Sequence, residues 1–168
     1  AEHAELQAHV DSVAPGMKVE AWDWSYVAEQ VRKARYAFDE ATVRQYFELN
    51  RVLDGMFFMA KELYGTTFVE RKDLPIYHPD VRVYEVFNED GSTVGLFYTD
   101  YYNRPSKRGG AWMNNFVEQS LLLGQKPVVV NVMNIQKPGE GQPTLLSFDE
   151  VITLFHEFGH GVHGLFSS

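Results

Sequence analysis

The sequence predicts an α+β fold from the order of three segments. Residues 1–65 have the spacing of apolar residues typical of helices. Residues 66–135 contain runs rich in Val, Phe and Tyr, which favour strands, and residues 147–166 again favour a helix. Helices that are separated along the chain from a run of strands are typical of α+β folds. We therefore expect a helical part, a small and mostly antiparallel sheet, and a final helix beside that sheet.

The first 37 residues predict two short helices. Residues 1–13 favour a helix or a frayed helical lead-in, and Pro15-Gly16 interrupts it. Ser25 can then cap a second helix that continues to about Ala37.

A longer helix is expected between Asp39, which can cap its start, and Gly65, which can end it. Gly55 can bend this helix. Its large side chains recur at largely helical spacing, and we interpret them as core packing rather than as a ligand site. They are Val43, Tyr46, Phe47, Leu49, Val52, Leu53, Phe57, Phe58, Ala60 and Leu63.

Three strands are expected in the middle of the chain. Val81–Phe87 and Val94–Tyr102 are joined by residues 88–92, whose Asn, Asp and Gly predict a hairpin turn. Val128–Ile135 is the third strand. Loops rich in Gly, Pro and charge are expected at Asn103–Gly110 and Gln136–Thr144.

The most informative motif is His156-Glu157-Phe158-Gly159-His160, which has the HExxH pattern of zinc-dependent peptidases. Positions i and i+4 lie on one face of a helix, so both imidazoles can bind the same metal ion. A glutamate next to the first histidine is then placed to take a proton from a metal-bound water. The pattern makes His156 and His160 candidate ligands and Glu157 a candidate general base.

The residues before the motif support a real helix. Ser147 and Glu150 form an S-x-x-E capping box, which satisfies free backbone N–H groups at a helix start. Apolar residues surround the histidines on most sides, which predicts a buried helix. The alternative is that both histidines are ordinary core residues held by hydrogen bonds. The apolar residues are Val151, Ile152, Leu154, Phe155, Phe158 and Val162.

His163 has two interpretations. It follows His160 by three residues and lies on nearly the same face, so it can be a third ligand. However, one further turn rises about 5.4 Å and carries the side chain away from an ion held by the first two. We favour a supporting role for His163. A catalytic zinc site needs three protein ligands, so the third is then expected outside this chain.

These residues and several upstream segments resemble the thimet oligopeptidase family of zinc peptidases, family M3. The resemblance extends from about Trp22 to Phe166. Within the family, the amino-acid sequence of these segments resembles the peptidyl-dipeptidase branch most, with the oligopeptidase branch as the close alternative. It is carried by Trp22-Asp23-Trp24, the run from Glu70 to Val83, the run from Arg104 to Met113, Gly141-Gln142-Pro143-Thr144-Leu145-Leu146 and the run from Ser147 to Phe166.

The resemblance implies a zincin-like catalytic domain of which residues 1–168 are one part. It implies one Zn²⁺ held by His156 and His160, with Glu157 as general base and a glutamate beyond the chain as third ligand. It further implies that short peptides are the substrates and that C-terminal dipeptides are released. Without its third ligand the chain is expected to be inactive alone. The alternative is a non-catalytic fragment that binds metal or peptide weakly.

The sheet has a possible role in substrate binding. An extended peptide can add to a sheet edge, where its backbone pairs with the strand. One of the strands here can supply that edge. The residues that would bind a substrate cannot be named from the sequence.

Composition narrows the remaining possibilities. The formal net charge is −8 and the basic residues are scattered, so no nucleic-acid surface is expected. The chain has no cysteine, no apparent signal peptide and no apolar run of the roughly 20 residues that span a membrane. We expect a cytoplasmic protein that does not bind membranes. An apolar fraction of 45% indicates a packed core, and exposed apolar surface can allow self-association.

Overall fold

The computed structural model describes residues 2–36 and 40–167. The chain divides into two compact units, residues 1–43 and residues 44–168. The motif helix and all five strands belong to the second unit. The prediction of one partial domain over residues 1–168 stays a prediction.

The first unit contains the two expected short helices, α1 (Glu2–Val13) and α2 (Trp24–Tyr36). The expected cap at Ser25 is wrong, because α2 begins one residue earlier and Ser25 lies inside it. Leu6 and Val10 of α1, Val27 of α2 and Val19 of the segment between them form a small core. Ala37, the expected end of the second helix, lies outside the described residues, as does the expected cap Asp39. The short helix α3 (Glu40–Arg44) falls at the boundary between the units.

The prediction of one helix from Asp39 to Gly65 is wrong, because α3 and α4 (Leu49–Tyr64) are separate. The chain between them pairs with the segment before the last helix. Leu49 N–H donates to the Thr144 carbonyl at 2.9 Å, and Leu146 N–H donates to the Phe47 carbonyl at 2.9 Å. These long-range bonds outweigh the helical spacing. Gly65 ends α4 in the left-handed region, at φ 69°, as expected.

The sheet has five strands in the order β1-β2-β3-β5-β4. The pair β3–β5 is parallel and the other three pairs are antiparallel, so the sheet is mixed but mostly antiparallel. The three expected strands and the hairpin at residues 88–92 are confirmed, whereas β1 and β4 were not expected. The strands are β1 (Thr67–Glu70), β2 (Arg82–Phe87), β3 (Thr93–Tyr102), β4 (Trp112–Val117) and β5 (Val128–Ile135).

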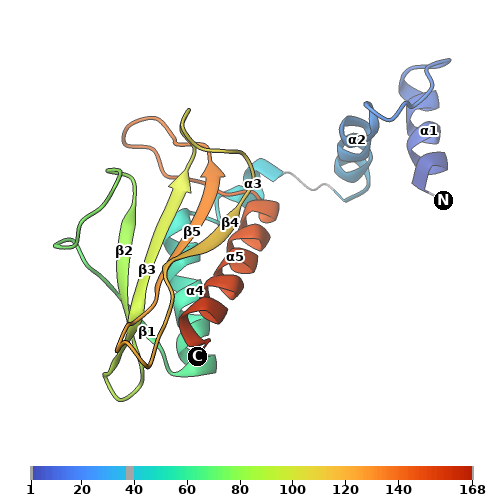
Figure 1. Cartoon of the computed structure of the whole chain (residues 1–168). Helices are drawn as coiled ribbons and strands as arrows, with labels where there is room; N and C mark the ends of the chain where they lie inside the picture. Colours follow the sequence, from blue (N-terminus) through green and yellow to red (C-terminus); the bar gives the residue numbers. More distant parts are fainter. Residues whose placement is uncertain (1, 37–39, 168) are drawn as a thin grey trace. The chain divides into compact units, whose positions relative to one another are not determined.

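Helices α4 and α5 (Phe148–Phe166) cover one face of this sheet (Figure 1). They form the main core with it, in which Phe158 packs edge-on against Phe97 with ring centroids 5.6 Å apart. A second, smaller core lies on the opposite face and includes Val83, Tyr98 and Val132. Helices on one face of a mostly antiparallel sheet confirm the α+β prediction.

Within the described residues, no helix is long and apolar enough to cross a membrane.

Candidate metal and peptide site

Helix α5 begins with the capping box that the sequence predicts. Glu150 N–H donates to Ser147 Oγ at 3.1 Å, and Ser147 N–H donates to Glu150 Oε2 at 2.7 Å. Asp149 and Glu150 also complement the positive end of the helix dipole. The start of the helix is therefore fixed eight residues before the first histidine of the motif.

The expectation that α5 is buried on nearly all sides is wrong. Its sheet-facing side is buried, with Leu154, Phe158 and Leu165 at most 1% exposed. His156 and His160 lie on the exposed side. Ile152 is also 52% exposed there, although it is apolar. In the described part of the second unit α5 packs against the sheet with one side only, so the other side stays open.

The two motif histidines face each other across one turn of α5. Their Nε2 atoms are 3.1 Å apart, and their rings are nearly perpendicular with centroids 4.7 Å apart. Because the two Nε2 atoms are this close, both can reach one common position beside the helix. Without a metal, the two atoms can share a hydrogen bond in which Nε2 of one ring donates and Nε2 of the other accepts.

This arrangement fits two ligands of a zinc ion. Zn–N bonds of about 2.0–2.1 Å in tetrahedral geometry place two ligand nitrogens about 3.3 Å apart. The observed 3.1 Å between Nε2 atoms is close to that value. The fit concerns His156 and His160 alone.

A third ligand is not found in the part of the chain that the structure describes. No group of three or more His, Asp or Glu side chains there can hold a metal ion. His163 is exposed and does not complete such a group with the pair. The supporting role of His163 stays a prediction.

Glu157 differs from the histidines beside it because it is only 8% exposed. Its side chain makes no hydrogen bond or ion pair with the described residues. Its backbone carbonyl accepts a hydrogen bond from Asn131 Nδ2 at 2.8 Å. Asn131 lies on β5 and is fully buried, so this bond fastens α5 to the sheet at the position of Glu157.

Glu157 lies on the side of α5 that faces β4. Gly164 follows it by two helical turns and shares its face. A Cβ atom added to Gly164 would lie 2.8 Å from Asn115 Oδ1 and 2.9 Å from Met113 Cε, and both residues belong to β4. The close approach of helix and strand therefore needs a glycine at this position. The ribbons of α5 and β4 accordingly lie next to each other (Figure 1).

Strand β4 is an edge strand. It pairs with β5 on one side, and on its other side no strand of the described chain pairs with it. The pairing register shifts between Asn115 and Val117, which leaves Phe116 as an extra residue. An open edge presents backbone N–H and C=O groups to which an extended peptide can bind. The structure thus has an open edge strand next to the candidate base.

Strand β4 is difficult to predict from the sequence. Asn114 and Asn115 in its centre disfavour strands, and Gly109-Gly110 before it favours a loop. Residues 112–117 (Trp-Met-Asn-Asn-Phe-Val) do not alternate between apolar and polar side chains, so the period-2 pattern of a half-buried strand is absent. Asn131 could have been noticed as a polar residue inside an apolar strand.

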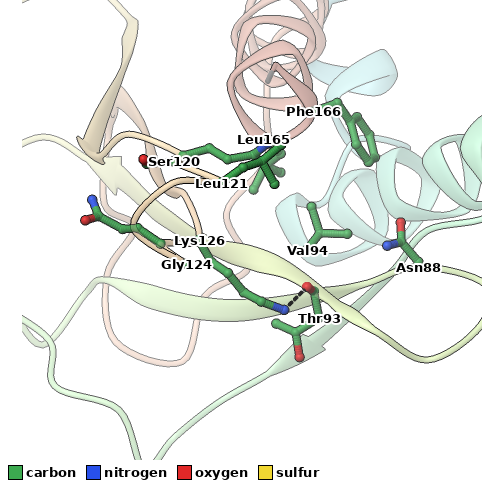
Figure 2. A pocket seen from close by; sticks show the side chains of 11 residues that line it. Asn88, Thr93, Val94, Ser120, Leu121, Gly124, Lys126, Leu165 and Phe166 are labelled. Carbon is green, nitrogen blue, oxygen red and sulfur yellow. Dashed lines mark hydrogen bonds between the residues drawn. The ribbon is translucent and has the colours of Figure 1, made fainter.

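A cavity of about 390 Å³ lies beyond the last turn of α5 (Figure 2). It is lined by Leu165 and Phe166 of the helix and by residues of the loop before β5, including Leu121. Lys126 closes one side by donating a hydrogen bond to the Thr93 carbonyl. None of the three motif residues lines this cavity, so it is separate from the candidate metal site.

Comparison with known proteins identifies the family. The model of peptidase family M3 matches residues 1–168. The chain is 58% identical to dipeptidyl carboxypeptidase of Salmonella typhimurium and 54% identical to that of Escherichia coli, in each case over 99% of its length. It is 41% identical to oligopeptidase A of Escherichia coli over 96% of its length.

The chain spans only about a quarter of the length of these relatives: 25%, 24% and 24% respectively. The family match nevertheless covers the whole chain and includes the motif helix, the sheet and the helices before them. This chain belongs to peptidase family M3.

Proposed function

We propose that the chain contributes two zinc ligands and the general base to a peptidase that hydrolyses short peptides. The observation that carries the proposal is the paired Nε2 atoms of His156 and His160, 3.1 Å apart, beside Glu157 and the open edge of β4. The family and the names of its relatives support peptide hydrolysis. Release of C-terminal dipeptides is proposed because two relatives are named dipeptidyl carboxypeptidase.

Each of these residues has a distinct role. His156 and His160 would hold the ion through Nε2. When bound, zinc supplies a Lewis acid that polarises the scissile carbonyl and makes water more acidic. Glu157 accepts the proton of the attacking water and donates it to the leaving amide nitrogen. Its limited exposure restricts the water around the carboxylate, which strengthens its electrostatic interactions.

The backbone of β4 would bind the substrate. A peptide added to its free edge lies next to the β4-facing side of α5, where Glu157 is found. Backbone pairing holds peptides of varied sequence in one extended conformation, which suits an enzyme of short peptides.

Substitution of the base tests this function. In the longest natural form of the protein, Glu157→Gln is expected to lower kcat by about 10²- to 10⁴-fold. Zinc content should stay at one ion per chain, because Glu157 is not a ligand. The matched control is Glu62→Gln on the exposed surface of α4, which should leave kcat unchanged. Normal activity of Glu157→Gln would exclude Glu157 as the base.

A non-catalytic role for the 168-residue chain alone is the second candidate. It is favoured by the absence of a third ligand from the described residues. We expect this chain, purified and dialysed against a mild chelator, to retain little zinc and to show no peptidase activity. Retention of about one zinc per chain would instead mean that a further ligand is supplied, for example by a second copy.

A further inference from the structure

The loop of residues 103–111 determines where the edge strand begins. It connects β3 to β4, and both of these strands flank β5. The loop must therefore cross the end of β5 before β4 can start at Trp112. Four side chains on the loop or on the strands beneath it bind it there, and we call them the loop clamp: Asp100, Arg104, Lys107 and Asn134.

Lys107 binds the loop to both parallel strands. Its ammonium donates to the carbonyl oxygens of Asp100 and Tyr102 on β3, each at 2.8 Å, and to that of Met133 on β5. It also lies 3.2 Å from Asp100 Oδ1. The side chain is only 6% exposed. A buried ammonium is costly unless it is paired and hydrogen-bonded, and here both conditions are met.

Arg104 and Asp100 hold the first arm of the loop. The guanidinium of Arg104 donates to both carboxylate oxygens of Asp100, at 2.6 and 2.7 Å. Tyr77 adds a hydroxyl bond to the same carboxylate at 2.9 Å. Asp100 is 3% exposed at its side chain. The two-pronged bond fixes the direction of the loop as it leaves β3.

Asn134 holds the second arm. Its Nδ2 lies on β5 and donates to the carbonyl oxygens of Arg108 at 2.8 Å and Gly110 at 2.7 Å. Gly110 has φ 85°, a left-handed conformation that favours glycine. Two residues later the chain enters β4. The last turn before the edge strand is thus bound directly to the neighbouring strand.

We propose that Lys107 and Asn134 are positioning residues for substrate binding. They fix the start of β4 on β5 and so set which backbone groups of the edge lie beside Glu157. A one-residue slip of β4 would move Met113 and Asn115 away from the face that Gly164 contacts. This inference rests on the proposed function, because it assigns the register of the peptide at that site.

The test compares Lys107→Met and Asn134→Ala with the wild type in the longest natural form of the protein. KM for a short peptide should rise about tenfold in Lys107→Met and about threefold in Asn134→Ala, as expected for loss of charged and neutral hydrogen bonds. A loss of binding common to substrate and transition state raises KM and leaves kcat unchanged. Zinc per chain should also be unchanged.

Amide hydrogen exchange separates positioning from general destabilisation. Exchange should become faster in residues 103–117 and stay slow in β2 and α5. The control is Lys126→Met, which removes a lysine that also binds a strand carbonyl, that of Thr93, but in the loop before β5. It should leave KM unchanged.

Three results would overturn the inference. One is an unchanged KM in both variants. Another is a raised KM accompanied by fast exchange throughout the second unit in both variants, which would indicate a structural role only. The third is a wild type that binds no zinc and cleaves no peptide, and it would overturn the proposed function as well. If only Lys107→Met unfolds, the KM and exchange of Asn134→Ala decide.

Discussion

The two faces of the sheet around β5 are held by different chemistry. The face covered by α5 is apolar, with Phe97, Val129 and Phe158 fully buried. The opposite face has the smaller apolar core and, in addition, a buried charged group at the end of β3, where Asp100 binds Arg104 and Lys107. Apolar contact is non-directional, whereas hydrogen bonds to charged groups depend on geometry. Apolar packing therefore positions α5 on the sheet, whereas directional hydrogen bonds position the loop of residues 103–111.

This difference matters for a site built from both parts. The motif residues belong to α5, and the edge strand follows the clamped loop. On the apolar face, Asn131 adds a directional bond to the carbonyl of Glu157. Glycines at 161 and 164 set how closely the helix approaches. Small side chains and a single amide thus fix the depth and rotation of α5 on a surface that would otherwise allow it to slide.

The largest effect on stability is expected on the apolar face. Phe158→Ala should lower the free energy of unfolding by about 3–5 kcal/mol, because a fully buried aromatic ring is lost and a cavity remains. Urea denaturation of the two proteins measures the difference. Phe58→Ala is the matched control, since Phe58 is 64% exposed on α4 and should cost less than about 0.5 kcal/mol. Equal losses would contradict the assignment of the core.

The close approach of α5 to the sheet predicts a smaller loss in the free energy of unfolding when a glycine between them is enlarged. Gly161→Val should cost about 1–3 kcal/mol through overpacking. A Cβ atom there would already lie 3.1 Å from Phe97 Cε2 and 3.3 Å from Asn131 Nδ2. Gly159→Val is the control on the exposed side of the same helix, where a Cβ meets nothing within 4 Å. Thermal unfolding of both variants tests this, and a similar Tm for the two would show that α5 can move away from the sheet without cost.

The sequence predicted the parts of this site that depend on local signals. Ser147 and Glu150 identified the start of α5, and the spacing of His156 and His160 identified their shared face. The burial of α5, in contrast, is lower than its apolar residues predicted. Residues such as Ile152 and Phe148 are apolar but lie on the side away from the sheet. The hydropathy of a residue does not show whether another helix or strand packs against its side chain.

Features that depend on long-range pairing were missed. The break before α4 comes from hydrogen bonds between Phe47, Leu49 and the segment before α5. Strand β4 has two asparagines and becomes a strand because it pairs with β5. The clamp likewise joins Lys107 to Met133, 26 residues away. Such contacts are set by topology, which short windows of sequence do not contain.

Low pH should reduce the stability that the ionised Asp100 carboxylate gives to the fold. Burial raises the pKa of Asp100, but hydrogen bonds from Arg104 and Tyr77 and the charge of Lys107 outweigh it, so the pKa lies below the ordinary value. A carboxyl group with a depressed pKa stabilises the fold above its unfolded pKa, about 3.9, and this stabilisation is lost as the pH falls through the folded pKa. The loss should be smaller than that from Gly161→Val, because three carbonyl oxygens still hold Lys107.

Denaturant unfolding between pH 6 and pH 2 measures this dependence. Asp100→Asn should show a flatter fall in stability at low pH than the wild type does. Phe158→Ala changes the apolar face only, and its curve should keep the wild-type slope. Parallel curves for wild type and Asp100→Asn would mean that other carboxyl groups cause the acid sensitivity.

The smallest effect is expected from His163→Ala on the open side of α5. The side chain is exposed, and the cap that His163 gives to Ser167 N–H uses its backbone carbonyl, which alanine retains. Stability should change by less than about 0.5 kcal/mol. Zinc content of the longest natural form should also stay at one ion per chain, whereas His160→Ala should lose the ion. Loss of zinc in both variants would make His163 a ligand and would mean that the last turn of α5 moves toward the pair when the metal binds.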